Sequence, residues 1–212
     1  MPAGREIVRL ALAALAFAAA VEAAATSVLL VTAGPGRAQL LVDDHTLREL
    51  RAGERSPEGI VLVAATREEA ALVVDGRETL LRPGERNDGR VTLFAARDRR
   101  FRARMQVNGV PAIGLIDTGA EAVTIGRPLA TALGIDYAQG RRAKLNTVVG
   151  PVPGYLVTLA SVRIGSIEVA GVPAVVADSD SPEFGLVLVG ATFLGRVHLE
   201  QHGNRLTLIP PK

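Results

Sequence analysis

The sequence predicts an all-β protein with one or two short helices, on three observations. Short runs rich in Val, Leu and Ile recur along the chain and alternate with turn residues, as in a series of strands. Asp75-Gly76 and Asn108-Gly109 each lie between two such runs, and dipeptides of this kind favour the two-residue turns of β-hairpins. Helical signals are confined to residues 127–133, bounded by Pro128 and Gly134, and to a single turn at 191–194.

The composition sets limits on the function. A chain of 212 residues with 48% hydrophobic residues is long enough for one or two domains with their own cores. Cysteine is absent, which excludes disulfides, thiolate metal sites and a cysteine nucleophile. The net charge of +2 is too small to indicate nucleic acid as a partner. The arginines between 97 and 104 partly alternate with apolar residues, which is typical of the solvated face of a half-buried strand.

Residues 1–25 have the pattern of a secretory signal peptide. Arg5 and Arg9 precede an apolar stretch at 10–21, and Ala23-Ala24-Ala25 offers a small-residue cleavage site. The stretch is shorter than the roughly 20 apolar residues of a membrane span. We therefore expect a periplasmic or secreted protein. The alternative is an inner-membrane protein anchored by an uncleaved N-terminal segment, and only then do we expect contact with a membrane.

Residues 26–89 are predicted to form a small β module. The expected strands lie at residues 28–31, 39–42, 60–63, 71–74 and 79–81. The sequence Leu50-Arg-Ala-Gly-Glu-Arg55 recurs as Leu81-Arg-Pro-Gly-Glu-Arg86, which indicates two similar strand-to-turn units packed together. The module contains no convincing catalytic set, so packing or binding is its expected role. Residues 83–90, rich in Gly, Asn, Asp and charge, are the best candidate for a linker to a second domain at 90–212.

Strands also dominate the second domain. They are expected at residues 101–107, 110–116, 122–125, 143–149, 155–164, 167–176, 186–189, 197–201 and 205–209. Asp117-Thr118-Gly119-Ala120 directly follows the second of them. An ionised carboxylate at the end of a buried strand must be paired, hydrogen-bonded or shifted in pKa, so this loop is the candidate reaction centre. The alternative is an Asx-turn, in which Asp117 bonds its own backbone two residues on.

Four ordered elements of residues 99–209 resemble a retropepsin-type aspartic protease of the bacterial families related to retroviral peptidases. They are the loop Leu115-Ile-Asp-Thr-Gly-Ala120, the flap-like tip Thr147-Val148-Val149-Gly150, the apolar element Val187-Leu-Val-Gly190, and an ending of Phe193-Leu194, Leu199-Glu-Gln201 and Asn204-Arg-Leu-Thr-Leu208. The resemblance covers just over half the chain. It implies a retropepsin-like acid protease β-barrel after the N-terminal module.

The resemblance implies a site and a partner. Asp117, Thr118 and Gly119 would be the catalytic residues, with Thr118 locking two loops together through its hydroxyl. Ala120, Val148, Val149 and Gly150 would contact substrate. The reaction needs two carboxylates, and the chain has no second Asp-Thr-Gly or Asp-Ser-Gly, so the other Asp is expected from a second copy in a homodimer. The expected function is an aspartic endopeptidase acting on polypeptide, without a metal, a cofactor or nucleic acid.

The sequence departs from the retropepsin pattern at two places, and a second function is possible. Pro151 and Pro153 remove backbone donors from the flap, which predicts a stiffer flap or one shifted in register. Gly114, inside a strand, is a candidate bulge. His198 and His202 are four residues apart, but they fall on a strand and its turn without a third ligand, which argues against a metal site. The alternative function is a non-catalytic cell-envelope module that binds proteins through a retropepsin-like fold.

Overall fold

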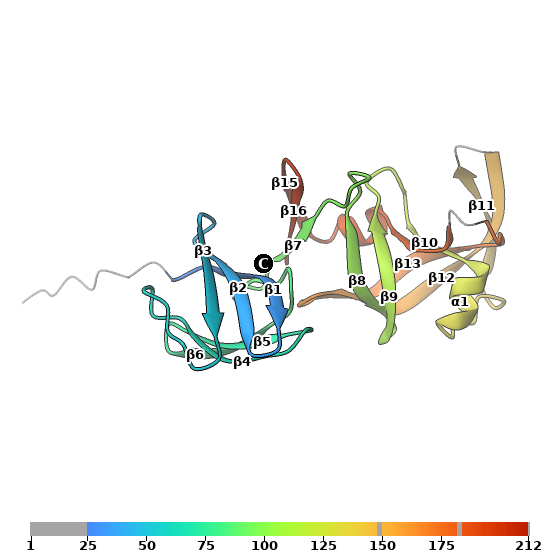
Figure 1. Ribbon diagram of the computed structural model, residues 1–212. Helices are drawn as coiled ribbons and strands as arrows, with labels where there is room; N and C mark the ends of the chain where they lie inside the picture. The colour runs from blue at the N-terminus through green and yellow to red at the C-terminus, as the bar shows by residue number, and fades with distance from the viewer. Residues whose placement is uncertain (1–24, 148–149, 182–183, 212) are drawn as a thin grey trace, which may run out of the picture.

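The computed structural model describes residues 25–147, 150–181 and 184–211, and it is an all-β structure with two short helices. The N-terminal strands and the C-terminal barrel form two units that lie side by side (Figure 1). Each has its own core: one cluster of buried side chains runs from Val28 to Leu81, and the other from Val91 to Leu208. The predicted signal peptide lies outside the described residues except for Ala25.

The N-terminal unit consists of two three-stranded antiparallel sheets. The first contains β1 (Val28–Gly34), β2 (Arg37–Val42) and β3 (Thr46–Arg51), and the second contains β4 (Val61–Ala65), β5 (Ala70–Val74) and β6 (Arg77–Leu81). Buried and exposed residues alternate along β2 and β5, so each sheet turns one face to the shared core. Strand β3 was missed from the sequence because only Leu50 on it is fully buried.

The repeated sequence forms the same turn twice. After β3, the N–H of Glu54 donates to the carbonyl of Arg51 (2.9 Å), and the Glu54 side chain accepts from the N–H of Arg51 (2.9 Å). After β6, Glu85 and Arg82 make the matching bonds at 2.8 and 2.9 Å. The third residue of each turn is a glycine with positive φ, a conformation that other residues adopt only with strain.

Each turn binds the first strand of the other sheet. Gly53 donates to the carbonyl of Leu62 on β4 (2.7 Å), while Gly84 donates to the carbonyl of Leu30 on β1 (2.8 Å). The bonds in the opposite direction also match: the N–H of Leu62 donates to the carbonyl of Glu54 (3.1 Å), and the N–H of Leu30 donates to the carbonyl of Glu85 (3.0 Å). The two predicted strand-to-turn units are therefore present, and they are packed together because the turn at the end of each sheet bonds to the first strand of the other sheet.

Residues 83–90 are bound tightly to the strands of the N-terminal unit. Arg86 is buried and its guanidinium donates to Asp44 (2.9 Å), while Asn87 donates its N–H to the carbonyl of Val28 (3.1 Å). Burial raises the pKa of the Asp44 carboxyl, but the hydrogen bonds and charge of Arg86 outweigh burial and leave that pKa below its ordinary value. The segment that composition marks as a linker is thus an ordered part of the N-terminal unit.

The second unit is a barrel. Its sheet has the order β11-β12-β13-β10-β14-β9-β8, and pairing of β8 with β12 closes it, leaving β11 as an outer strand. The strands are β8 (Arg102–Val107), β9 (Val110–Ile116), β10 (Val123–Gly126), β11 (Arg141–Thr147), β12 (Gly150–Ile164), β13 (Ile167–Ala177) and β14 (Val187–Val189). A separate sheet joins β7 (Val91–Phe94) to β16 (Arg205–Ile209) and β15 (His198–His202).

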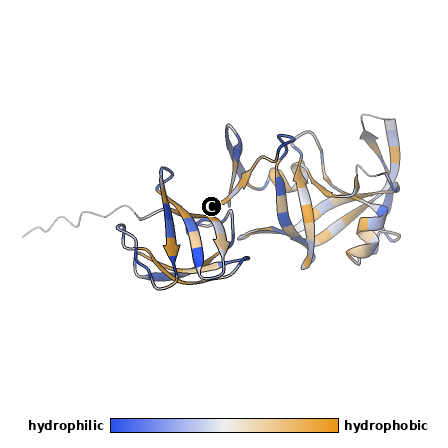
Figure 2. Cartoon of the chain, viewed as in Figure 1, coloured by the Kyte–Doolittle hydropathy of each residue, from blue (hydrophilic) through white to orange (hydrophobic). Residues whose placement is uncertain are grey.

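Both predicted helices are present, as α1 (Arg127–Ala132) and α2 (Ala191–Leu194). Pro128 occupies the first turn of α1, where its missing N–H costs no hydrogen bond, and Gly134 follows the helix with a φ of 68°. Phe193 of α2 is fully buried in the barrel core. Apolar and polar residues alternate along the barrel strands in Figure 2, as expected for strands with one buried face.

Two parallel pairings distinguish the barrel from the N-terminal unit. β9 pairs with β14, and β10 pairs with β13, both in parallel. The described pairings of the N-terminal sheets are all antiparallel. Because parallel strands end at the same edge of a sheet, the loop after β9 and the loop after β14 meet.

Candidate active site

Asp117 is the first residue after β9, at this meeting point. Ile116 lies opposite Val189 of β14 in the parallel pairing, and the N–H of Asp117 donates to the carbonyl of Val189 (3.1 Å). The strand therefore ends with its backbone fixed to β14. The Asp117 residue is half-buried, while Thr118 and Gly119 beyond it are exposed.

The loop closes as a tight turn. Gly119 donates its N–H to Oδ1 of Asp117 (2.9 Å), and Ala120 donates its N–H to the carbonyl of Asp117 (3.2 Å). The Asx-turn considered from the sequence is thus present. It occupies only one carboxylate oxygen, because no donor within the described chain reaches Oδ2 of Asp117. The turn bond orients the carboxylate and leaves its second oxygen available.

The element after β14 supports the loop from behind. A Cβ at Gly190 would lie 2.4 Å from the carbonyl oxygen of Ala122 and 2.6 Å from that of Ala120, so only glycine fits there without moving the loop. The next residue, Ala191, donates its N–H to the carbonyl of Ala120 (2.8 Å). The apolar element at residues 187–190 and the residue after it therefore support the loop by close backbone contact.

Thr192 adds a brace that the sequence analysis missed. Its hydroxyl accepts the N–H of Val123 (2.9 Å), which ties the start of β10 to α2. The available signal was one hydroxyl residue in an otherwise apolar stretch from Val187 to Leu194. Thr118 behaves differently, since its hydroxyl has no hydrogen bond within the described residues.

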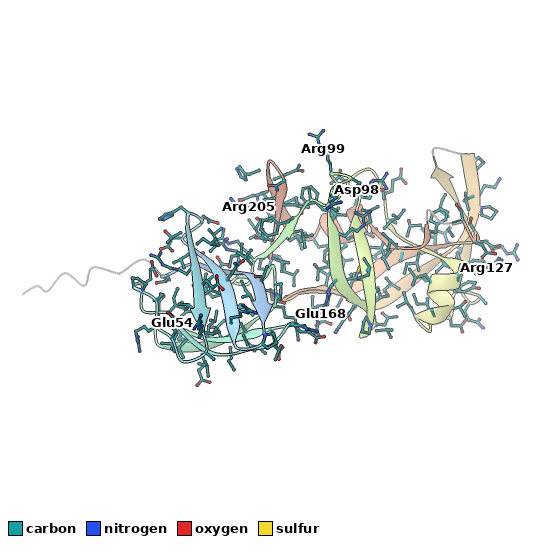
Figure 3. The ribbon with its side chains drawn as sticks, in the orientation of Figure 1. Glu54, Asp98, Arg99, Arg127, Glu168 and Arg205 are labelled. Carbon is teal, nitrogen blue, oxygen red and sulfur yellow. The ribbon has the colours of Figure 1, made fainter. Side chains whose placement is uncertain are left out.

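Two other acidic residues of the barrel, Asp178 and Asp180, are engaged away from the Asp117 loop. Arg127 donates to Asp178 (2.8 Å) and to Asp180 (2.7 Å), and Figure 3 shows Arg127 at the α1 side of the barrel. The hydrogen bond and charge of Asp180, together with the charge of Asp178, raise the pKa of the Arg127 guanidinium. These two carboxylates therefore belong to an ion-pair cluster that fixes α1.

The flap-like hairpin is formed by β11 and β12. Val148 and Val149, predicted to contact substrate, lie outside the described residues, and Gly150 follows with a φ of 113° opposite Thr147. The predicted shift in register is wrong for the described pairs, because they run without a break from Arg141–Leu156 to Thr147–Gly150.

The prolines do not weaken this hairpin. The carbonyl of Pro153 accepts the N–H of Asp178 (2.8 Å), so residue 153 points its backbone away from β11. Pro151 has the same orientation, since residues two apart along a strand point the same way. Both missing N–H groups therefore lie on the side of β12 that faces away from β11, and the hairpin loses no bond.

Gly114 is not at a bulge, contrary to the sequence-based expectation. It pairs regularly with Ala103 on one side and Val187 on the other. A Cβ there would lie 2.4 Å from Sδ of Met105 and 2.9 Å from Cγ2 of Val189. The position is a glycine because the barrel interior leaves no room for a side chain.

His198 and His202 lie on the exposed strand β15. Among the described residues, no three His, Asp or Glu side chains are arranged to hold a metal ion. The helices described are also all too short or too polar to cross a membrane.

Comparisons with known proteins find similarity to aspartic proteases in the residues of the barrel. The family model described as gag-polyprotein putative aspartyl protease matches residues 103–196. A retropepsin-like aspartic protease from Rickettsia conorii is 26% identical, with 56% of this chain and 89% of that chain covered and a TM-score of 0.49. EIAV protease in complex with the inhibitor HBY-793 is 20% identical, with 45% and 86% covered and a TM-score of 0.36. No curated protein matches the sequence.

The family match supports the retropepsin-like aspartic protease resemblance that was inferred from the sequence motifs. The predicted all-β fold, a barrel with two short helices after a set of N-terminal strands, is confirmed.

Proposed function

We propose that the barrel is an aspartic endopeptidase in which Asp117 from each of two chains activates water. The observation that carries the proposal is the braced Asp117 loop: Asp117 N–H is bound to Val189, its Oδ1 is bound to Gly119 N–H, and Oδ2 has no donor in the described chain. This loop lies inside the residues that match the aspartyl protease family model. A fixed carboxylate with one available oxygen is suited to general acid–base chemistry.

The second carboxylate is proposed to come from a second copy of the chain. The sequence has one Asp-Thr-Gly, and the Asp178 and Asp180 side chains are both bound to Arg127. A twofold axis beside the loop would bring the two Asp117 residues together, since a C₂ interface uses the same surface twice. The exposed Thr118 hydroxyl, without a hydrogen bond in its own described chain, would then find its partner across that axis.

The chemistry follows from two carboxyl groups that share one proton. The ionised Asp117 takes a proton from water, whose oxygen forms a bond to the peptide carbonyl carbon. The protonated Asp117 of the other chain donates its proton to the carbonyl oxygen. As the C–N bond breaks, the Asp117 that took the proton from water gives it to the amine nitrogen, and the other Asp117 takes a proton from a hydroxyl of the intermediate, which leaves a carboxylic acid and restores the shared proton. Ala120 and residues 148–150 are proposed to contact the extended substrate, and residues 1–25 to direct the protein out of the cytoplasm.

Replacement of the reacting carboxyl group tests the proposal. Asp117→Asn should fold as the parent does but lose at least about 100-fold in the rate of hydrolysis of an unfolded polypeptide, because general acid–base catalysis contributes factors of this size or larger. The matched control is Asp136→Asn, an exposed carboxylate that makes no ion pair within the described residues, and it should keep full activity. A peptidomimetic inhibitor of aspartic proteases should block the parent.

Dilution tests the shared site. Specific activity should fall as the protein is diluted below its dimer dissociation constant, because the active species follows mass action. Excess Asp117→Asn chain should also inhibit the parent by forming mixed dimers. Activity that stays proportional to concentration while sedimentation shows only monomer would overturn the two-chain site. Binding of polypeptide without any cleavage by the parent would favour the alternative of a non-catalytic binding module.

A further inference from the structure

A cleft of about 680 Å³ lies between the N-terminal unit and the barrel. Its walls carry five arginines and two glutamates, and Glu69, Asp98 and Glu168 beside the cleft pair with three of the arginines. The charged residues of the walls are Arg67, Glu68, Arg82 and Glu85 from the N-terminal unit, and Arg102, Arg104 and Arg163 from the barrel.

The barrel wall carries a row of arginines because of strand alternation. Ala103 and Met105 of β8 point into the core, so Arg102 and Arg104 both point outward. Arg163 lies on the same wall from β12, paired with Gln106 of β8. The arginines between 97 and 104 are all exposed, as predicted for a solvated face, and two of them, Arg102 and Arg104, also line the cleft.

Two of the five arginines have no ion pair within the described residues. Arg102 is bound to Asp98 (2.6 Å) and Arg163 to Glu168 (2.8 Å), and Figure 3 shows these two acids at opposite ends of the β8–β9 pair. Arg67 and Arg104 are exposed and unpaired, one on each wall.

Neither of the two glutamates in the described lining forms an ion pair with Arg67 or Arg104. Glu85 is buried, and its Oε2 accepts the N–H of Arg82 (2.9 Å), so it stabilises its own turn. Arg82 lies 3.9 Å from Glu69 and 4.0 Å from Glu85, which are long, weak contacts for an exposed pair. Glu68 alone presents an exposed negative charge.

We propose that this cleft binds acidic segments of polypeptide substrates, away from the peptide bond that is cleaved. The lining mixes free guanidinium groups with apolar surface from Phe94, Pro83 and Pro111, which suits carboxylates interspersed with apolar side chains. A nucleic acid carries a phosphate at every step and would need a longer row of unpaired cations than Arg67 and Arg104 provide.

The position of the cleft connects it to the reaction centre. Arg102 pairs with Leu115 of β9, two residues before Asp117. A peptide in the cleft therefore lies against the same hairpin that ends in the Asp117 loop, and one substrate chain can contact both. The binding does not require catalysis, but its role in selecting substrates rests on the proposed peptidase function.

Binding is measured on the full chain carrying Asp117→Asn, so that the result does not depend on activity. The probes are fluorescent peptides of equal length, one alternating Glu with Leu and Ala and the other with Ser in place of Glu. We expect the Glu peptide to bind at least about tenfold more tightly at low salt and to weaken as salt screens the charges. Arg67→Glu with Arg104→Glu should remove this preference, while Arg51→Glu with Arg77→Glu, an equal charge change outside the cleft, should keep it.

Several outcomes would overturn the proposal. They are equal affinity for the two peptides, loss of the preference in the Arg51/Arg77 control, or stronger and cleft-dependent binding of a single-stranded oligonucleotide. Far-UV circular dichroism and thermal unfolding show whether each variant is folded. If the double variant does not fold, the single variants Arg67→Ala and Arg104→Ala replace it, and each is expected to lose part of the preference for the Glu peptide. Without any hydrolysis by the parent, retained binding would reject the peptidase and leave the acidic-peptide site standing.

Discussion

The turn after β6 and the turn after β9 have the same backbone closure and opposite side-chain chemistry. In each, the fourth residue donates its N–H to the carbonyl of the first: Glu85 to Arg82 at 2.8 Å, and Ala120 to Asp117 at 3.2 Å. In the first turn a glutamate side chain returns to the backbone, and Gly84 has a φ of 93°. In the second turn the acidic residue is the first one, Asp117, whose side chain accepts the N–H of Gly119, and Gly119 is not in the positive-φ region.

The difference lies in what packs behind each turn. The turn after β6 is bound by β1 and by Thr92 of β7, which occupy its polar groups. The turn after β9 is supported from one side only, by Gly190 and Ala191, because parallel pairing of β9 and β14 brings two loops to one edge. A hairpin followed by a tight turn thus serves as structure in one unit and as a candidate reaction centre in the other.

The largest effect is expected from crowding the support behind the Asp117 loop. Gly190→Ala would place a methyl group 2.4 Å from the Ala122 carbonyl and 2.6 Å from the Ala120 carbonyl, so the loop must move. Overpacking of this kind costs about 1–3 kcal/mol, and displacement of a reacting group costs about 100-fold in rate. Hydrolysis assays and denaturant unfolding measure the two effects.

The control is the same substitution in the N-terminal unit. A Cβ at Gly34 meets only Arg37 side-chain atoms at 3.7 Å and beyond, which is ordinary contact, so Gly34→Ala should leave hydrolysis unchanged. If Gly190→Ala retained the parent's activity and stability, the close support of the Asp117 loop would be wrong.

The second effect is on stability rather than on the rate of hydrolysis, and it is expected from a cavity in the N-terminal core. Leu62 is fully buried there and also receives the Gly53 bond from the other turn. Leu62→Ala should lower the free energy of unfolding by about 2–5 kcal/mol. Hydrogen exchange should show faster opening of β1 to β6, while the amides of β9 and β14 keep their protection, because the two cores are separate clusters. Equal loss of protection in both units would show that they open together.

The smallest effect concerns pH and one ion pair of the N-terminal unit. Hydrogen bonds from Arg48 lower the pKa of Glu58 from 4.5 to about 2. Because the folded pKa lies below the unfolded one, the pair's stabilisation is complete above about pH 4.5 and is lost as the pH falls toward 2. Thermal unfolding of Glu58→Gln should therefore differ from the parent at pH 6 and converge with it near pH 2. A constant difference over this range would contradict the assignment.

Local sequence patterns predicted most strands, both helices and the all-β class, because alternation and turn dipeptides act over a few residues. Strand β7 was missed because it is stabilised by β16, more than 100 residues later in the chain. Closure of the barrel by β12 and β8 and the shape of the arginine cleft also depend on distant segments. At the site, the sequence predicted Asp117 and the apolar element at residues 187–190, but the hydrogen bond of Thr192 and the close contacts around Gly114 depend on the three-dimensional packing.

The single strand β12 imposes a rule on how this chain can change in length during evolution. Its 15 residues pair with β11 at the flap end, with β13 along the middle and with β8 at the barrel seam. Deleting or inserting one residue inside β12 would reverse the inward and outward faces of everything beyond that point, since strand side chains alternate with a period of two. Length variation among descendants of this chain should therefore collect at the two ends of β12, where the hairpin turns can absorb it, and be absent from its interior.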